Sequence, residues 1–318
     1  MKTFKNYYPL LILVVTAFLT ACGAGSESSS TSSTGNKTVG VVTAATNSQI
    51  TVSGSSFNTG GSTVNSNEIA SVADVHPGMV VTVHADDSGN AEEIEYDAEV
   101  EGIVDSIGTG VMVVMGQSVD ISQNPAFVSE MPAVTDINNI PVGAMVEVSG
   151  YSDSMGNIVA TYVRLEDHMA DENDEMELEG IITALDTTGG TFMIGDQLIN
   201  YDPASISLTL EDGLNVEVKI AMDTAGSLHA TEIEIEDNHS EDGHEGDSVD
   251  IQGMVSGELG LDGSFTIDGE MVILGDTVHF EDGLNTDSIT DGAILEVEGQ
   301  LNADGVLVVT EVSTPEMM

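Results

Sequence analysis

The segment Val100-Glu101-Gly102-Ile103-Val104 is the clearest copy of a short pattern that recurs along the chain. The pattern consists of an apolar residue, any residue, a glycine and two further apolar residues. The other copies are Leu178-Glu179-Gly180-Ile181-Ile182, Ile251-Gln252-Gly253-Met254-Val255 and, in a weaker form, Thr38-Val39-Gly40-Val41-Val42. A pattern that returns in a fixed order is typical of tandem structural units. The sequence therefore predicts four modules of about sixty residues each.

Each copy is followed by a second strand pattern that begins with glycine, at residues 78–83, 143–148, 213–218 and 292–297. A turn rich in Asp, Asn and Ser then carries Gly89, Gly156, Gly226 or Gly305, and such residues tolerate the positive φ of hairpin loops. Apolar and polar residues alternate in stretches such as 232–236, which indicates strands with one face in water. About five short strands per module predict a closed barrel, because closure removes strand edges that would otherwise aggregate.

We therefore expect an all-β chain of four tandem, small, antiparallel β-barrel modules of the OB-like kind, after a signal peptide and a flexible tether. The expected boundaries are a signal peptide at 1–21, a Ser/Thr/Gly tether at 22–37, modules at 38–98, 99–166, 178–236 and 250–314, and acidic linkers at 167–177 and 237–249. Like charges in the linkers repel one another and extend the chain. The modules are accordingly predicted to behave as beads on a semi-flexible string.

The start motif, the Gly-x-x-Val-x-Val strand, the Gly turn and the Ala-Thr-x-Ile/Val ending, as at 230–233, together resemble a known family. This is the domain of unknown function 5666 family, whose tandem domains occur in bacterial envelope proteins and lipoproteins. The resemblance covers nearly all of residues 38–314. It implies a β-barrel module of unassigned activity and brings no catalytic residues with it.

The N-terminal residues resemble the signal of a bacterial lipoprotein. Lys2 and Lys5 precede an uncharged stretch at 9–21, which is too short to span a bilayer, and Leu19-Thr20-Ala21 leads directly into Cys22, the only cysteine. The resemblance implies cleavage before Cys22 and acyl chains on that residue. By the same resemblance, Gly23 in the next position favours the outer membrane over the inner one. The protein could face either the periplasm or the outside of the cell. The alternatives are an ordinary secreted protein or an uncleaved anchor helix.

Charge limits the expected partners. The chain has 55 acidic and 5 basic residues, and loss of Lys2 and Lys5 with the signal would leave 3 basic residues and a net charge of −52. Contacts to phosphates need basic groups, so this composition predicts that the chain does not bind nucleic acid. The expected partners are the membrane, through the lipid anchor, and an envelope protein or exported polymer.

The acidic linkers supply the candidate metal ligands. Hard cations such as Ca²⁺ or Mg²⁺ bind several closely spaced oxygens. The candidates are Asp171, Asp174, Glu175, Asp237 and Asp242. The run from 171 does not match an EF-hand, because Met176 stands where that loop needs glycine. A solvated acidic surface explains the same residues, so no cofactor is expected to be required.

Motifs for catalysis are missing from the sequence. It contains no Gly-x-Ser-x-Gly, His-Glu-x-x-His or Walker pattern, and its single cysteine is the expected lipid site. We therefore expect a lipid-anchored cell-envelope binding or scaffold protein without catalytic activity. One alternative is an envelope stalk that binds divalent cations through its linkers and hairpin aspartates. A second is a glycoside-active enzyme that uses two carboxylates, although any acidic pair satisfies that requirement.

Overall fold

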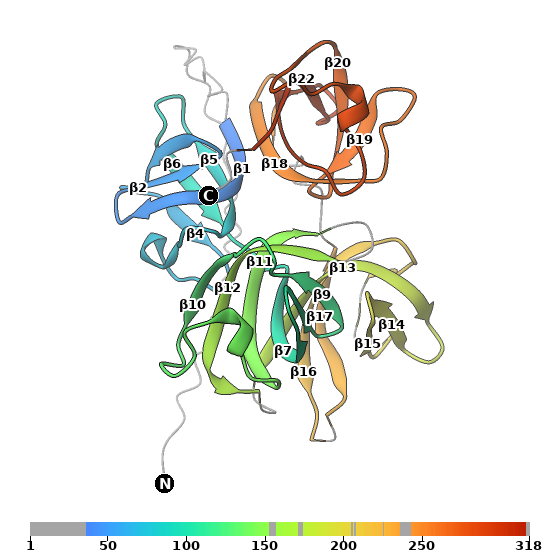
Figure 1. The fold of residues 1–318 in the computed structure, drawn as a ribbon. Coiled ribbons are helices and arrows are strands. Elements are labelled where there is room, and N and C mark those ends of the chain that lie inside the picture. The colour runs from blue at the N-terminus through green and yellow to red at the C-terminus, as the bar shows by residue number, and fades with distance from the viewer. Residues whose placement is uncertain are drawn as a thin grey trace, which may run out of the picture. The chain divides into compact units, whose positions relative to one another are not determined.

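The computed structural model describes residues 36–152, 157–170, 174–204, 206, 208–224, 226–235 and 243–315. These residues form strands β1 to β22 and three short 3-10 helices, so the predicted all-β class is confirmed (Figure 1). The helices are η1 (Val72–Asp74), η2 (Ile137–Asn139) and η3 (Thr286–Ser288). None of them is long and apolar enough to cross a membrane.

The second barrel shows the arrangement most completely. Its strands are β7 (Val100–Ile107), β8 (Val111–Val114), β9 (Gln117–Asp120), β10 (Ala126–Ser129), β11 (Ala144–Ser152) and β12 (Ile158–Met169). The ring runs β7–β8–β9–β12–β11 and returns to β7. All of these pairings are antiparallel except β9–β12, and β10 pairs in parallel with the later part of β12. The result is a small closed barrel of the OB-like kind.

The other three modules repeat this ring, which in barrel 1 closes through the isolated bridge Asn58↔Asn90. Barrel 1 contains β1 (Asn36–Thr46), β2 (Gln49–Val52), β3 (Ser55–Asn58), β4 (Thr63–Asn65), β5 (Val80–Ala85) and β6 (Ala91–Glu95). Barrel 3 contains β13 (Glu175–Asp186), β14 (Thr191–Ile194), β15 (Gln197–Asn200), β16 (Asn215–Met222) and β17 (Leu228–Ile235). Barrel 4 contains β18 (Ser248–Ser256), β19 (Ser264–Ile267), β20 (Glu270–Phe280), β21 (Ile294–Leu301) and β22 (Leu307–Ser313).

One hydrogen bond explains the glycine that begins each second strand pattern. In every barrel its N–H donates to the carbonyl two residues after the marker glycine of the start strand. The pairs are Gly78 to Val42 at 2.8 Å, Gly143 to Val104 at 2.8 Å, Gly213 to Ile182 at 2.9 Å and Gly292 to Val255 at 2.8 Å. The four glycines have φ between +78° and +99°, a region that side chains rarely adopt.

The marker glycine of the start strand makes room for a hairpin turn. A Cβ on Gly102 would lie 2.1 Å from Sδ of Met115, and one on Gly253 would lie 2.5 Å from Cβ of Asp268. Met115 and Asp268 occupy the same place, the first residue of the two-residue turn between the second and third strands, with φ of 44° and 49°. The marker glycine is therefore needed because the turn between the second and third strands packs directly against the start strand.

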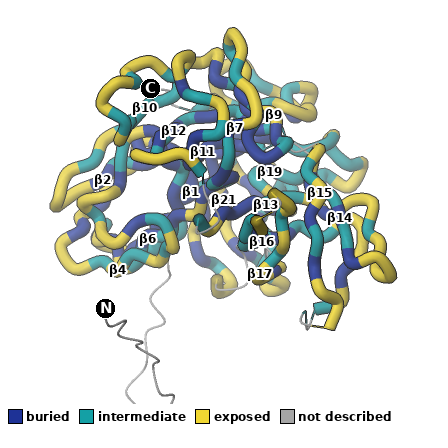
Figure 2. Tube along the Cα trace, turned by 90° about the horizontal axis from the view of Figure 1, so that it is seen from below, coloured by how far each residue is buried: buried dark blue, intermediate teal, exposed yellow. Residues whose placement is uncertain are grey.

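Apolar side chains fill the barrels, and exposed residues gather mainly at the turns (Figure 2). Barrels 2 and 3 share one continuous apolar core. The core of barrel 4 also includes Val39 of barrel 1, and the core of barrel 1 also includes Tyr162 of barrel 2. A smaller cluster of Val41, Tyr151 and Met254 joins barrels 1, 2 and 4. Burying a side chain of this size contributes roughly 1.5–3 kcal/mol.

The start strands also join barrel to barrel. The second half of β7 pairs with β8, so the first half presents one free edge, and β13 pairs with that edge through Val100↔Leu178 and Glu101↔Glu177. In the same way β1 pairs in parallel with β18 (Figure 1). The expectation of beads on a string is wrong: strand edges outweigh linker repulsion, and the described residues belong to one unit.

The expected linkers and tether are shorter than predicted. Strand β12 continues to Met169 and β13 already begins at Glu175, so much of 167–177 is strand. Likewise β18 begins at Ser248, inside the expected linker 237–249, and β1 begins at Asn36, inside the expected tether. The physical reason is alternation, because in β13 the acids alternate with Met176 and Leu178, which enter the core.

Candidate cation-binding site

The basic residues of the described part of the chain all stand beside acids. The ion pairs are Lys37 with Glu270 at 3.8 Å, Arg164 with Glu147, with Glu166 at 3.1 Å and with Glu130 at 3.7 Å, and Lys219 with Glu217 at 3.9 Å and Glu232 at 3.5 Å. The Lys37 pair connects barrel 1 to barrel 4. Each of these basic residues therefore pairs with at least one largely buried carboxylate, namely Glu270, Glu147 or Glu217.

Strand register extends this arrangement into one row across barrels 2 and 3. Successive strand partners in the row are Arg164, Glu147, Glu101, Glu177, Lys219 and Glu232. Directly opposite side chains in a sheet lie about 5 Å apart. Glu147, Glu101 and Glu177 are thus three consecutive acids in the row. Arg164 lies opposite the first of them and Lys219 opposite the last.

Glu147 is the most completely buried member of the row. Its side chain is fully covered and accepts hydrogen bonds from the Arg164 guanidinium and from the hydroxyl of Tyr96. Burial raises the pKa of Glu147, while Arg164 opposes that shift. Burial, with the nearby Glu147 next, raises the pKa of Glu101 to about 7. Arg164 therefore stabilises one carboxylate of the row and leaves the next one short of positive charge.

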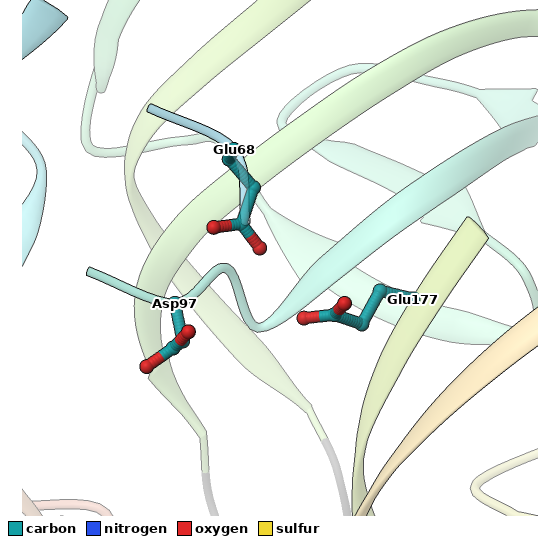
Figure 3. Close-up of side chains that lie close together, drawn as sticks. All are labelled: Glu68, Asp97 and Glu177. Carbon is teal, nitrogen blue, oxygen red and sulfur yellow. The ribbon is translucent and has the colours of Figure 1, made fainter. Parts of the chain in front are cut away.

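A tight carboxylate cluster lies beside this row. Carboxylate oxygens of Glu68, Asp97 and Glu177 all lie within 4.8 Å of one another. Figure 3 shows the carboxyl groups of Glu68 and Glu177 turned toward the space between the three residues. Glu177 belongs to barrel 3, Glu68 to barrel 1, and Asp97 to the turn between barrels 1 and 2. We call these three residues the carboxylate cluster.

Local structure holds each member of the cluster in place. The Ser66 hydroxyl donates to Glu68 Oε2 at 2.6 Å and accepts from the N–H of Glu68 at 3.1 Å, which fixes the turn that presents this acid. Asp97 follows Tyr96, whose N–H donates to the Asn65 carbonyl at 3.1 Å. Glu177 lies on β13 between two buried apolar residues, so its backbone cannot move independently of the core of barrel 3.

Two carboxyl oxygens of the cluster are buried without a hydrogen-bond partner. Glu177 is only 6% exposed, and its Oε1 has no hydrogen-bond partner. Glu68 Oε1 is also buried and also has no hydrogen-bond partner. Burial first, and then the charges of Glu68 and Glu217, raise the pKa of Glu177 to about 9. Lys219 faces Glu177 across the ladder, but its ammonium group pairs with Glu217 and Glu232.

A cavity of about 250 Å³ adjoins the cluster through Asp97. Residues of all four barrels line it. Its acidic residues are Glu95, Asp97, Glu99, Glu179, Asp268 and Glu270. Burial is the main cause that raises the pKa values of Glu179 and Asp268 to about 7 each. The cavity therefore attracts cations and also favours protons.

A second group of acids lies on barrel 4. Asp250, Glu296 and Glu298 also have carboxylate oxygens within 4.8 Å of one another, and burial raises the pKa of Asp250 to about 8. Asp250 and Glu177 occupy the same place in the repeat, three residues before the marker glycine. Glu99 and Lys37 hold that place in the other two copies. This repeated charged position is the signal by which sequence reasoning could have found the cluster.

The predicted ligands fall elsewhere. Asp174 pairs with Nε2 of His168 at 3.0 Å, and Glu175 is exposed at the start of β13. Neither belongs to the carboxylate cluster or to the group on barrel 4. Asp171, Asp237, Asp242 and the expected lipid site Cys22 lie outside the described residues. Their roles stay predictions.

Comparison with known families agrees with the repeats. The model of the family described as "Domain of unknown function (DUF5666)" matches residues 39–95, 101–164, 179–234 and 252–313. The chain belongs to this family. The resemblance proposed from the start motif is thereby confirmed, and each DUF5666 match falls on one barrel. No curated protein matches the chain.

Two solved structures are similar to parts of the DUF5666 chain. One is a multidomain protein with nucleic acid binding domains from Streptococcus pneumoniae, 11% identical over 69% of this chain and 73% of that one, with a TM-score of 0.19. The other is Drosophila Unr CSD456, 14% identical over 65% of this chain and 99% of that one, also with a TM-score of 0.19. The prediction that the chain does not bind nucleic acid is corrected. It rested on net charge alone, and one of these similar structures is described as having nucleic acid binding domains. TM-scores this low assign no ligand to this chain.

Proposed function

We propose that this chain is a non-catalytic scaffold protein of the bacterial cell envelope, anchored through a lipid on Cys22, that holds its four DUF5666 barrels together as one acidic binding body. The observation that carries the proposal is the pairing of start strands, β7 with β13 and β1 with β18. Backbone hydrogen bonds between barrels fix their relative register in a way that a tether does not.

Side chains support the same union. Gln252 of barrel 4 is 1% exposed, and its Oε1 accepts from the N–H of Val41 and from the hydroxyl of Ser53, both at 3.2 Å, in barrel 1. Gln117 of barrel 2 donates to the Ile194 carbonyl of barrel 3 at 2.8 Å. Buried polar groups without partners cost about 1–3 kcal/mol each, so separating the barrels would expose or orphan these groups.

The cavity favours this proposal over a glycoside-active enzyme. At about 250 Å³ it is smaller than the roughly 300–1,000 Å³ typical of ligand pockets. Its described lining contains no aromatic side chain on which a sugar ring could stack. Its acids instead surround a space that suits small cations.

Zero-length crosslinking tests the union of barrels 1 and 4. A carbodiimide couples an amine to a carboxylate in contact with it, and Lys37 and Lys219 are the only lysines after residue 5. Treatment of the full chain in detergent, followed by peptide mass spectrometry, should give a Lys37–Glu270 link. Lys219 with Glu232 serves as the internal control because both lie in barrel 3, and Lys37→Arg should abolish only the first link. A Lys219 link without any link from Lys37 to Glu270 would refute the proposed union.

A second candidate function is a scaffold whose barrels respond to divalent cations. The carboxylate cluster favours it, because its members come from three different parts of the chain and two of them, Glu68 and Glu177, have a buried oxygen without a partner.

A further inference from the structure

We propose that Glu68, Asp97 and Glu177 bind one Ca²⁺ ion, which connects barrel 1, the turn before barrel 2, and barrel 3. No predicted ligand from the acidic linkers takes part. The inference rests on the barrels forming one body, because the three residues come together only when barrels 1 and 3 meet.

The distances fit calcium. Ca²⁺ binds oxygens at about 2.3–2.6 Å, so two oxygens on opposite sides of one ion lie at most about 5 Å apart. The chosen oxygens of the cluster lie within 4.8 Å of one another, which meets that limit. Mg²⁺ usually keeps several of its waters and binds through one or two carboxylates, whereas a site with three carboxylates suits Ca²⁺. Zinc prefers nitrogen and sulfur ligands, and the cluster offers oxygen alone.

The buried oxygen without a partner is the observation that points to a ligand. A buried carboxylate without compensation is costly, and folded proteins pair such groups or place a metal beside them. Oε1 of Glu177 lies in a residue that is 6% exposed, on a strand fixed by the core, and its carboxyl faces the cluster (Figure 3). Glu68 is held on the opposite side by Ser66, with its own Oε1 buried and unpaired.

The acid-lined cavity offers a route to the site. Asp97 lines the cavity and belongs to the cluster. A cleft lined by charges of one sign raises the local concentration of counter-ions. A cation that enters the cavity therefore meets Asp97 before it meets the more deeply buried Glu177.

Titration calorimetry tests the inference. The full chain in detergent is titrated with CaCl₂ at pH 7.5 and fixed ionic strength. The expected result is one saturable site. Glu177→Gln should weaken Ca²⁺ binding at least tenfold. The matched control is Glu175→Gln, an exposed acid on the same strand and face, which should leave the affinity unchanged.

Each other outcome counts against the site. Absence of saturable binding, or equal affinity in Glu177→Gln, would overturn the inference. Asp97→Asn, with circular dichroism to confirm folding, provides a second variant if Glu177→Gln folds poorly, and it should lower the affinity in the same way. The Lys37–Glu270 crosslink uses none of these residues. A crosslink without calcium binding would therefore refute the site and leave the scaffold intact.

Discussion

The variant Glu177→Gln makes the electrostatic cost of the carboxylate cluster measurable without any metal. Glutamine keeps the size of the side chain but cannot ionise. In the folded protein the pKa of Glu177 is raised to about 9, against about 4.3 for an unperturbed glutamate. The folded state thus binds a proton that the unfolded state gives up. Stability from this group is fully present below about pH 4.3 and is lost as the pH rises toward 9.

The size of the effect follows from the shift. Each pKa unit corresponds to about 1.36 kcal/mol, so between pH 5 and pH 7 ionisation of Glu177 in the unfolded state should cost the wild type about 3 kcal/mol. The variant does not pay that cost. The difference in unfolding free energy, variant minus wild type, should therefore become more positive by about this amount over the interval.

The assay is urea unfolding of the full chain in detergent, followed by circular dichroism at pH 5, 6 and 7 with a chelator present. Other acids whose pKa values are raised destabilise both proteins with the same sign, so they largely cancel in the difference. Among these acids, Glu101, Glu179, Asp250 and Asp268 have pKa values raised to about 7 or 8. The exposed Glu175→Gln should run parallel to the wild type. If Glu177→Gln also runs parallel, the buried proton assigned to Glu177 does not exist.

Two further predictions concern glycine positions and the N-terminal cysteine. Gly78→Ala should destabilise the chain more than Gly213→Ala in thermal unfolding: both have φ near +98°, which costs about 1–2 kcal/mol for alanine, but only a Cβ on Gly78 would meet backbone of another barrel, the Thr161 carbonyl at 2.7 Å. Equal losses would mean that barrels 1 and 2 do not touch there. Cys22→Ser should abolish incorporation of labelled fatty acid in a bacterial host, and continued labelling would show that the anchor is not on this residue.

The barrels were predictable from sequence because their signals are local. The marker glycine, the strand-leading glycine and the turn glycine each meet a demand within one module, as the bond from Gly143 to Val104 shows. Alternation then distinguishes the buried face of each strand from the wet one. Four similar copies made these patterns visible even without an alignment.

The union of the barrels was not predictable, because it depends on which strand edges remain free after each ring closes. The sequence counted Glu177 among linker acids, since a run of charges hides the alternation of Met176 and Leu178. Glu68 and Asp97 lie in turns and carry no pattern of their own. Three carboxylates that meet from distant parts of the chain leave no spacing for a motif search to detect.

The pairing of start strands also gives the number of barrels a physical meaning. Each barrel contributes one half-strand edge, and the edges are consumed two at a time, the second with the third and the first with the fourth. An array with an odd count would leave one edge uncovered, and an uncovered edge is a template for another chain. An even number of barrels thus lets every start-strand edge pair within the same chain, whereas an odd number would leave one edge to pair with another chain.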